Sequence, residues 1–305
     1  MGRKNYDSSH QFNFNQLMKI VLFFFITFSL SAQIKGVVKD SISGQPIPYV
    51  NIWVENETIG TTSEENGSFS LDIKEEKVLV FSALGYETKK SSSKNEIILL
   101  KPKVFELKEV MVLNQKKTKE LEIGDAHKVH ISQLSGNKPW IYAKLFNYDY
   151  KYKETPFVKK IVFYSNSDIK GAKIKIRIFG FNDSIPSEDL INEDIIVTVK
   201  GGMKKNTIDV SHYNIEFPKS GLVIGLEWLI IEENKYFFTY KDTKTKQKVS
   251  LENYAPSLVI NHSPDEISFT YSKGKWYKHK RHSSNFKKEW NNKVNTPAIN
   301  LILTN

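Results

Sequence analysis

Two groups of histidines are the residues of this 305-residue chain that most directly suggest a metal site. One group contains Asp125, His127 and His130, and the other contains His279 and His282. Within each group two histidines are three positions apart, a spacing that brings side chains together on a helix but not on a strand. The first group shows no clear helical pattern, so we expect no metal ion there.

The second histidine group lies in a strongly basic run. Lys278, Lys280 and Arg281 surround His279 and His282, and their charges would repel a cation. We therefore expect a solvated basic loop here, and we expect neither a metal nor another cofactor in this protein.

Signatures of catalysis are missing from the sequence. The chain has no cysteine, which excludes cysteine-ligated zinc, iron–sulfur clusters and thiol nucleophiles. It also has no Gly-x-Ser-x-Gly, His-Glu-x-x-His or phosphate-binding glycine loop. The carboxylate pairs Glu188-Asp189 and Glu232-Glu233 are adjacent residues, which point in opposite directions on a strand. We expect no catalytic residue, with a glycan hydrolase or esterase in the second half as the alternative.

Aromatic and basic side chains favour binding instead. Tyr, Phe and Trp make up 12% of the chain, and exposed rings of this kind stack on sugars. The ligand-binding candidates are Trp276, Tyr277 and Trp290 for stacking, with Lys280 and Arg281 for salt-sensitive attraction of an anionic glycan. The competing interpretation places Trp276 in a core, since it follows a glycine turn in a short strand.

Four tyrosines at even spacing, Tyr142, Tyr148, Tyr150 and Tyr152, could add an exposed aromatic row. Aromatic residues in β proteins more often pack in cores or in cross-strand pairs, and we prefer that interpretation.

The formal net charge of +10 favours an anionic partner. Removing residues 1–32, which hold Arg3, Lys4, Lys19 and Asp7, leaves +8. The lysines are scattered along the chain, so we expect an anionic envelope component as partner and no nucleic acid.

The strands that must position these residues are clearest in residues 34–100. Apolar and polar residues alternate at Val50-Asn51-Ile52 and at Phe69-Ser70-Leu71, as in strands with one buried face. Glycine and proline mark the turns between strands. Asn66-Gly67, between Thr61-Thr62 and Phe69, is the strongest hairpin signal in the chain.

A longer series of residues in this stretch carries a family resemblance. The series is Gly36-Val37-Val38, Asp40, Gly44, Pro46-Ile47, Val50, Ile52, Val54, Gly60-Thr61-Thr62-Ser63, Asn66-Gly67, Phe69 and Gly85-Tyr86. Residues 33–101 thereby resemble the carboxypeptidase regulatory-like domain, a small transthyretin-like β-sandwich. In that family the domain is an accessory module without catalytic residues, so the resemblance implies a fold and no activity.

Residues 1–32 are predicted to be a secretory signal peptide. Lys19 precedes the apolar run Ile20–Leu30, and the small residues Ser31-Ala32 follow it. Because a membrane span needs ~20 apolar residues, we expect cleavage near Ala32 and no transmembrane span afterwards. Met18 is the start that this pattern suggests, and an uncleaved N-terminal anchor is the alternative. The expected location is the periplasm, the outer membrane or the exterior.

Residues 104–120 are predicted to be a short strand and a linker. Leu107, Glu109, Val110 and Val112 resemble the segment that follows the same module in TonB-dependent outer-membrane transporters. A transporter barrel needs ~22 strands of about ten residues, and about 190 residues remain. We therefore expect no transporter, with an accessory partner of a transport system as an alternative function.

Residues 121–305 are predicted to form a second β-sandwich. The expected strands cover residues 140–146, 157–164, 172–181, 195–200, 207–210, 222–232, 236–240, 257–260, 267–271, 275–277 and 298–303. Strict alternation over Lys173–Ile178 predicts one face in water, whereas the apolar run Leu222–Ile231 predicts a strand covered on both faces. Only Gly124–Leu134 and Ser187–Ile191 could hold a turn of helix.

The order of features in the second half also shows a loose resemblance to jelly-roll carbohydrate-binding sandwiches. These features are Arg177-Ile178-Phe179, Pro186–Leu190, Asp209-Val210-Ser211 and Gly221–Trp228. The sequence thus predicts an all-β protein of two sandwiches, transthyretin-like over residues 33–103 and jelly-roll-like over residues 121–305. The expected function is non-catalytic binding or assembly in the cell envelope, with a glycan or an envelope protein as partner.

Overall fold

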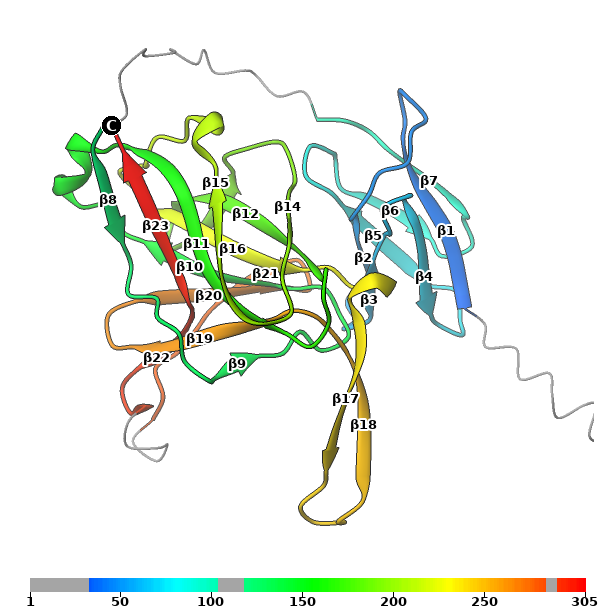
Figure 1. Ribbon diagram of the computed structural model, residues 1–305. Helices are drawn as coiled ribbons and strands as arrows, with labels where there is room; N and C mark the ends of the chain where they lie inside the picture. Colours follow the sequence, from blue (N-terminus) through cyan, green and yellow to red (C-terminus); the bar gives the residue numbers. More distant parts are fainter. Residues whose placement is uncertain (1–32, 104–117, 284–289) are drawn as a thin grey trace, which may run out of the picture.

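The computed structural model describes residues 33–103, 118–283 and 290–305 (Figure 1). The elements there are strands and three short 3₁₀ helices: η1 (Tyr150–Glu154), η2 (Ser211–Tyr213) and η3 (Glu232–Asn234). The predicted all-β class is confirmed. The expected signal peptide and the strand expected over Val104–Leu113 lie outside the described residues.

The first sandwich consists of two small sheets that face each other. One sheet has the order β4-β1-β7, with β1 (Gln33–Asp40), β4 (Ser68–Asp72) and β7 (Ile97–Leu100). The other has the order β3-β2-β5-β6, with β2 (Asn51–Val54), β3 (Gly60–Thr62), β5 (Val78–Ser82) and β6 (Lys89–Ser92). Alternate residues of these strands, among them Val38, Ile52 and Phe81, form its buried core.

The turn at Asn66-Gly67 is present, but the expected hairpin is wrong. The strands on either side of it, β3 and β4, belong to opposite sheets, and β4 pairs with β1. Gly67 has a φ of +74°, and a Cβ there would lie 2.6 Å from the carbonyl oxygen of Val38. The glycine therefore lets the chain pass close to the backbone of Val38 as it runs from one sheet to the other. The Asn-Gly pair in the sequence does not distinguish such a turn from a hairpin.

The second sandwich has two larger sheets. The first has the order β13-β12-β16-β10-β20-β21, with β10 (Ile141–Phe146), β12 (Lys173–Asn182), β13 (Ile185–Asp189), β16 (Leu222–Trp228), β20 (Ile267–Ser272) and β21 (Lys275–Lys278), and β14 (Ile195–Thr198) pairs with β12. The second has the order β22-β19-β11-β23-β8, with β8 (Glu120–Ile123), β11 (Phe157–Ser167), β19 (Ser257–Ser263), β22 (Val294–Pro297) and β23 (Ile299–Thr304). Two strands lie off this path, because β15 (Gly202–Asp209) pairs with β11 and β9 (Ser132–Gln133) pairs with β19.

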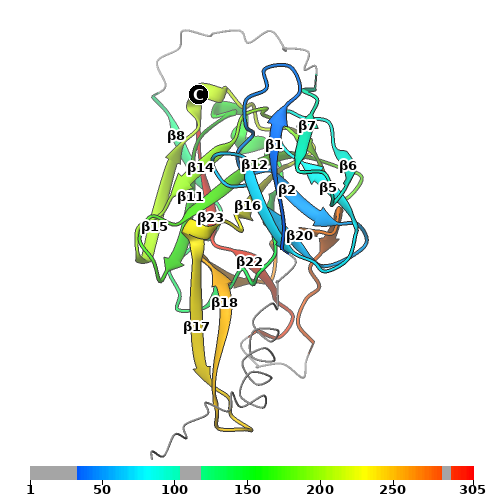
Figure 2. The ribbon, with the colours of Figure 1, turned by 90° about the vertical axis from the view of Figure 1, so that its right-hand side faces the viewer.

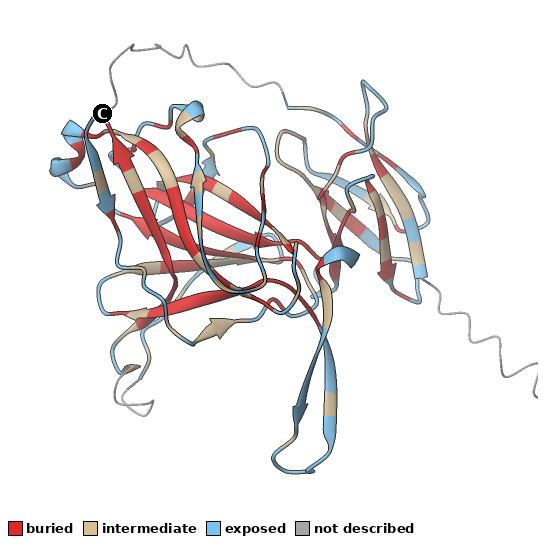
Figure 3. Cartoon of the chain, viewed as in Figure 1, coloured by how far each residue is buried: buried red, intermediate tan, exposed pale blue. Residues whose placement is uncertain are grey.

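The central strand β16 is buried at each of its residues, as the apolar run predicts. It lies between β12 and β10 in the largely buried part of the second sandwich (Figure 3). Its Trp228 is the largest fully buried side chain of the described residues and belongs to the main core. The strand ends at Trp228, and the last apolar residues of the run, Leu229 and Ile231, leave the sheet and pack with Tyr49 of the first sandwich.

Two expectations for local structure are wrong. Ser187–Ile191, which could have held a helical turn, overlaps strand β13, which pairs with β12, and the three 3₁₀ helices lie outside both segments where a helical turn was expected. The polar face of Lys173–Ile178 does not lie in water, since Lys175 is 1% exposed and Arg177 is largely covered. Both side chains face the first sandwich, which the alternation in a single strand does not reveal.

The two sandwiches lie side by side in Figure 1, and Figure 2 views the molecule with the first sandwich in front of the second. Hydrogen bonds connect them. The hydroxyl of Thr62 in β3 accepts a hydrogen bond from the backbone N–H of Ile230 at 3.1 Å. The carboxylate of Glu64 accepts another from the N–H of Glu232 at 2.9 Å. Within the described ranges no helix has the length and apolar character that a membrane span requires.

Candidate functional site

A cleft of about 550 Å³ opens between the two sandwiches. Asn51 and Trp53 of β2 line it on one side, and Arg177 of β12, Tyr271 of β20 and Trp276 of β21 line it on the other. Its volume lies within the range of small-molecule sites, and it combines aromatic walls with a few polar groups, as such sites do.

A network of buried charges forms the floor of this cleft. Glu227 of β16 is 1% exposed and accepts hydrogen bonds from the side-chain amide of Asn51 and from Arg177, the latter at 3.1 Å. Arg177 also donates through Nε to Asp189 of β13 at 2.7 Å. Lys175 donates to the carbonyl oxygen of Tyr49 at 3.1 Å. The floor is thus built by both sandwiches.

The environment of Glu227 keeps this carboxylate charged. Burial alone would raise its pKa, but the charges of Arg177 and Lys175 and the hydrogen bond from Asn51 hold the pKa below its ordinary value. Glu227 pairs with Arg177, so it does not resemble the protonated acid of a glycosidase pair, whose pKa is raised.

Aromatic rings form the wall that the second sandwich contributes. Trp276 packs edge-on against Phe179 with ring centroids 5.2 Å apart, and Tyr271 lies 5.1 Å from Trp276. Burial raises the pKa of Tyr271, so its hydroxyl stays protonated. Asn51 also lines the cleft, and its side-chain oxygen is buried and accepts no hydrogen bond from the described residues.

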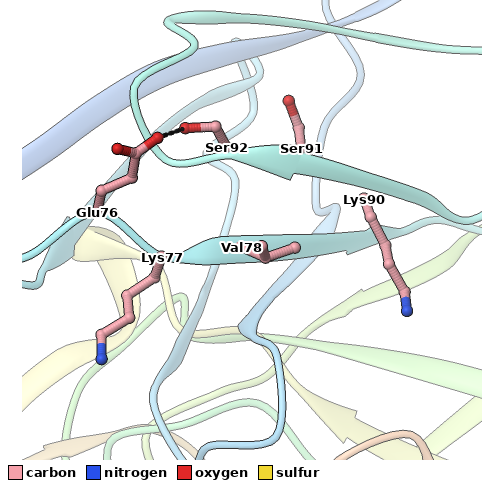
Figure 4. Close-up of a pocket in the computed structure, with 6 residues that line it drawn as sticks. All are labelled: Glu76, Lys77, Val78, Lys90, Ser91 and Ser92. Carbon is pink, nitrogen blue, oxygen red and sulfur yellow. Dashed lines mark hydrogen bonds between the residues drawn. The ribbon is translucent and has the colours of Figure 1, made fainter.

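A second hollow, of about 430 Å³, lies over β5 and β6 of the first sandwich. Figure 4 shows Glu76 pointing at Ser92, whose hydroxyl donates to it at 2.8 Å. Glu76 also pairs with Lys94 and Lys77 pairs with Glu57, so the charges of this hollow already have partners. We therefore take the cleft between the sandwiches as the candidate site.

The structure places one of the sequence-predicted ligand residues in the cleft. Trp276 is half-buried in its wall, whereas Tyr277, on the opposite face of β21, is 49% exposed. Lys280 and Arg281 are exposed beyond the end of β21. Trp290 stacks on His262 with ring centroids 4.5 Å apart. Trp276 and Tyr277 therefore lie on opposite faces of β21, and only Trp276 lines the cleft among the described residues of this set.

The tyrosines expected at even spacing do not form an exposed row. Tyr142 is buried in β10, and Tyr152 packs on Phe217. Tyr148 contacts both Tyr152 and Phe217, which leaves Tyr150 exposed by itself. The 3₁₀ helix η1 breaks the strand period on which the row depended.

The two histidines of the second group, His279 and His282, have separate partners. His279 stacks on Tyr142 and contacts the hydroxyl of Thr270 at 2.6 Å, and burial lowers its pKa. His282 contacts the amide oxygen of Asn295 at 2.8 Å. In the part of the chain that the structure describes, no three acidic or histidine side chains gather in a geometry suited to a metal.

Sequence reasoning missed the polar residues of the cleft floor, which are Asn51, Arg177, Asp189 and Glu227, and the buried Lys175 beside them. One feature of the sequence does point to these residues, because Glu227 is the one charged residue inside the apolar run Leu222–Ile231. A charge is buried in such a strand only with a partner. The partner residues come from distant segments, so the sequence alone could not name them.

Comparison with known proteins identifies the first sandwich. Residues 34–112 match the family model of the CarboxypepD_reg-like domain. This part of the chain is therefore a carboxypeptidase regulatory-like domain, as its series of motif residues predicts.

Two curated relatives share this region. The TonB-dependent receptor SusC of Bacteroides thetaiotaomicron is 29% identical over 113 residues, which cover 36% of this chain and 11% of the receptor. The TonB-dependent receptor P3 of Formosa agariphila is 27% identical over 132 residues, which cover 40% of this chain and 13% of the receptor. The chain thus matches only a small part of each receptor's length.

A search of solved structures finds a clostridial cysteine protease, Cwp84 after propeptide cleavage, at a TM-score of 0.37 and 10% identity. The alignment covers 84% of this chain and 65% of the protease. The likeness is too slight to carry an argument about fold or function.

Proposed function

We propose that this protein is an exported, non-catalytic binding or assembly protein of the cell envelope that works with an outer-membrane transport system. The observation that carries the proposal is the similarity of its first sandwich to regions of two TonB-dependent receptors. Hydrogen bonds between the sandwiches support a role for the whole chain as one unit, because Asn51 of the regulatory-like domain donates to Glu227 and Lys175 donates to the carbonyl oxygen of Tyr49.

Fractionation of the producing cells tests this proposal. A C-terminally tagged chain should sediment with the outer membrane or appear in the periplasm, and mild crosslinking should enrich a TonB-dependent receptor over an exported β-sandwich protein with the same tag. Recovery of the tagged chain in the cytoplasm, or no receptor above the control level, would contradict the proposal.

A second candidate function is carbohydrate binding in the cleft between the sandwiches. The rings of Trp53, Tyr271 and Trp276 along this cleft favour it, together with the polar side chains of Arg177 and Asp189. Sugars offer apolar faces for such rings and hydroxyl groups for such polar side chains.

Calorimetric titration with neutral and acidic oligosaccharides tests this candidate. Tyr271→Ala should weaken binding at least about tenfold, the value of one lost aromatic contact and its burial. Tyr277→Ala is the matched control, because Tyr277 lies on the neighbouring strand but outside the cleft, and it should bind normally. Equal losses in both variants, or no binding of any oligosaccharide by the unmodified protein, would exclude the cleft.

The basic segment Lys278–Arg281 remains a separate prediction for acidic glycans. If Lys280 and Arg281 attract such a ligand, their reversal to glutamate should weaken binding mainly at low salt, because the screening length shortens to ~8 Å at physiological ionic strength. If the variant loses binding equally at low and high salt, the loss results from misfolding and not from the missing charges. No loss at low salt would remove this segment and Trp290 as a ligand surface.

A further inference from the structure

A two-stranded ribbon projects from the second sandwich. It consists of β17 (Lys235–Lys241) and β18 (Lys248–Tyr254), which pair antiparallel with each other and with no other described strand (Figure 1). Figure 3 shows that most of its length is exposed. Both outer edges of the ribbon therefore carry backbone groups free to pair with another strand.

The base of the ribbon is firmly attached. The side chain of Asn234, which is fully buried, accepts from the N–H of Lys173 at 2.7 Å and donates to the carbonyl oxygen of Leu229 at 2.9 Å. Asn253 accepts from the hydroxyl of Ser135 at 2.9 Å. The orientation of the ribbon is thus set by the sandwich.

One face of the ribbon is apolar and uncovered. Directly opposite residues share a face, and here Phe238 pairs with Leu251 and Tyr240 pairs with Val249. Phe238 is 40% exposed, Tyr240 39% and Leu251 50%, and the rings of Phe238 and Tyr240 stack at 6.0 Å. We call these four residues the apolar ribbon face.

The ribbon is costly as an isolated element. A two-stranded hairpin is marginally stable in water, and exposed aromatic edge strands promote aggregation. Lys241 lies directly opposite Lys248, and like charges in that arrangement repel. Contacts that cover the apolar ribbon face and neutralise the lysines would remove these costs.

The charges at the tip of the ribbon indicate which kind of partner could bind there. Its tip carries Lys241, Lys244, Lys246 and Lys248 against the single carboxylate of Asp242, which already accepts from the N–H groups of Lys244 and Thr245. A second copy of this chain, with the same tip and a net charge of +10, would be repelled. The occupant is therefore anionic.

A membrane surface fits the ribbon poorly. The apolar ribbon face lies between the body and the lysine tip, so tip-first insertion would place four lysines deeper than the aromatic rings. Lipid chains also offer no hydrogen bonds to the two free edges. A protein strand can satisfy an edge, cover alternate apolar residues and present carboxylates.

We infer that the ribbon is a docking site for a partner protein that contributes an extended acidic strand. The strand pairs with a free edge of the ribbon and continues the apolar ribbon face through its own alternate apolar residues. Its carboxylates lie against Lys244 and Lys246 at the tip. This surface is separate from the cleft and from the regulatory-like domain.

Photocrosslinking in the producing cells tests the inference. The full chain carries p-benzoylphenylalanine in place of Tyr240, on the apolar ribbon face, or in place of Thr239, on the other face. The Tyr240 position should give one discrete protein adduct, and the Thr239 position should give little. Sequencing of the crosslinked peptide should reveal a strand-forming segment with alternating apolar and acidic residues.

Charge reversal provides the second arm of the test. Lys244→Glu with Lys246→Glu should lower the adduct yield about five-fold, whereas Lys204→Glu with Lys205→Glu, the same change on exposed β15 residues, should leave it unchanged. Thermal unfolding should be similar in both variants, because all four side chains are exposed.

Each other outcome would overturn the inference. An adduct with the mass of two chains would identify a second copy, and a phospholipid adduct would identify a membrane. A crosslinked segment without acidic residues, equal adducts from both faces, or no adduct would also refute it. These results leave the proposed envelope function standing, because cell fractionation tests that function independently.

Discussion

Replacing Glu227 by glutamine tests how much the buried charge network beside the first sandwich stabilises the protein. The substitution keeps the volume and the contact with Asn51 but removes the charge that faces Arg177 and Lys175. Removing one partner of a buried ion pair costs about 3–5 kcal/mol. Arg177 retains Asp189 and Lys175 retains Asp194 at 3.0 Å, so we expect the lower end, about 3 kcal/mol.

Thermal unfolding of the purified protein measures this loss. A destabilisation of that size should lower the Tm by about 6–12 °C for a protein of this length. The matched control is Glu252→Gln, which breaks the more exposed pair with Lys235 at 2.8 Å. Pairs of this kind contribute at most about 1 kcal/mol, so the control should melt close to the unmodified protein.

The pH dependence supplies a second readout for Glu227. Because its pKa is lowered in the folded state, its stabilising effect is fully present above the unfolded-state pKa of about 4.3 and is lost as the pH falls through the folded pKa. The unmodified protein should therefore lose stability below that pH more steeply than Glu227→Gln does. A variant that melts with the unmodified protein and keeps its acid profile would refute the assigned role of the network.

Three further predictions concern the fold and the cleft wall. Trp276→Ala should cost less than the ~3–5 kcal/mol of Trp228→Ala by thermal unfolding, because Trp276 is half-buried and Trp228 is fully buried. Gly67→Ala should destabilise the protein by clearly more than Gly44→Ala, for which we expect ~1 kcal/mol. Both glycines have a positive φ, but of the two only Gly67 would place a Cβ against backbone atoms. Equal losses of stability in the two variants would contradict the close approach of Gly67 to the Val38 backbone. The pKa of His279 is lowered by burial, so stability should fall as the pH drops below about 6.5 and His279→Gln should flatten that fall.

The first sandwich was largely predictable because local residues determine it. Asp40 and Tyr86 of the motif meet in the structure, where the tyrosine hydroxyl donates to the carboxylate at 3.0 Å. Asp40 also accepts from the N–H groups of Ile42 and Ser43 and thereby orders the turn after β1. Only the pairing across Asn66-Gly67 failed, since a turn signal does not state which sheet the next strand joins.

The candidate site was predictable only in part. Trp276 could be singled out because aromatic residues after a turn are recognisable in sequence. The sequence predicted that Lys175 and Arg177 face water, because polar and apolar residues alternate along their strand. Alternation shows that the two faces of a strand differ, but it does not show what covers the polar face. Here the covering element is β2, more than a hundred residues earlier in the chain.

The missed polar face explains why the two sandwiches have one defined arrangement. An apolar contact such as that of Tyr49 with Leu229 and Ile231 is non-directional and tolerates sliding. The hydrogen bonds from Asn51 to Glu227 and from Lys175 to the carbonyl oxygen of Tyr49 have fixed directions, and a shift of β2 past β12 would break them. We infer that these hydrogen bonds specify the arrangement more than they strengthen it, as buried polar groups do in other interfaces. The width of the cleft then follows from the same bonds that form its floor.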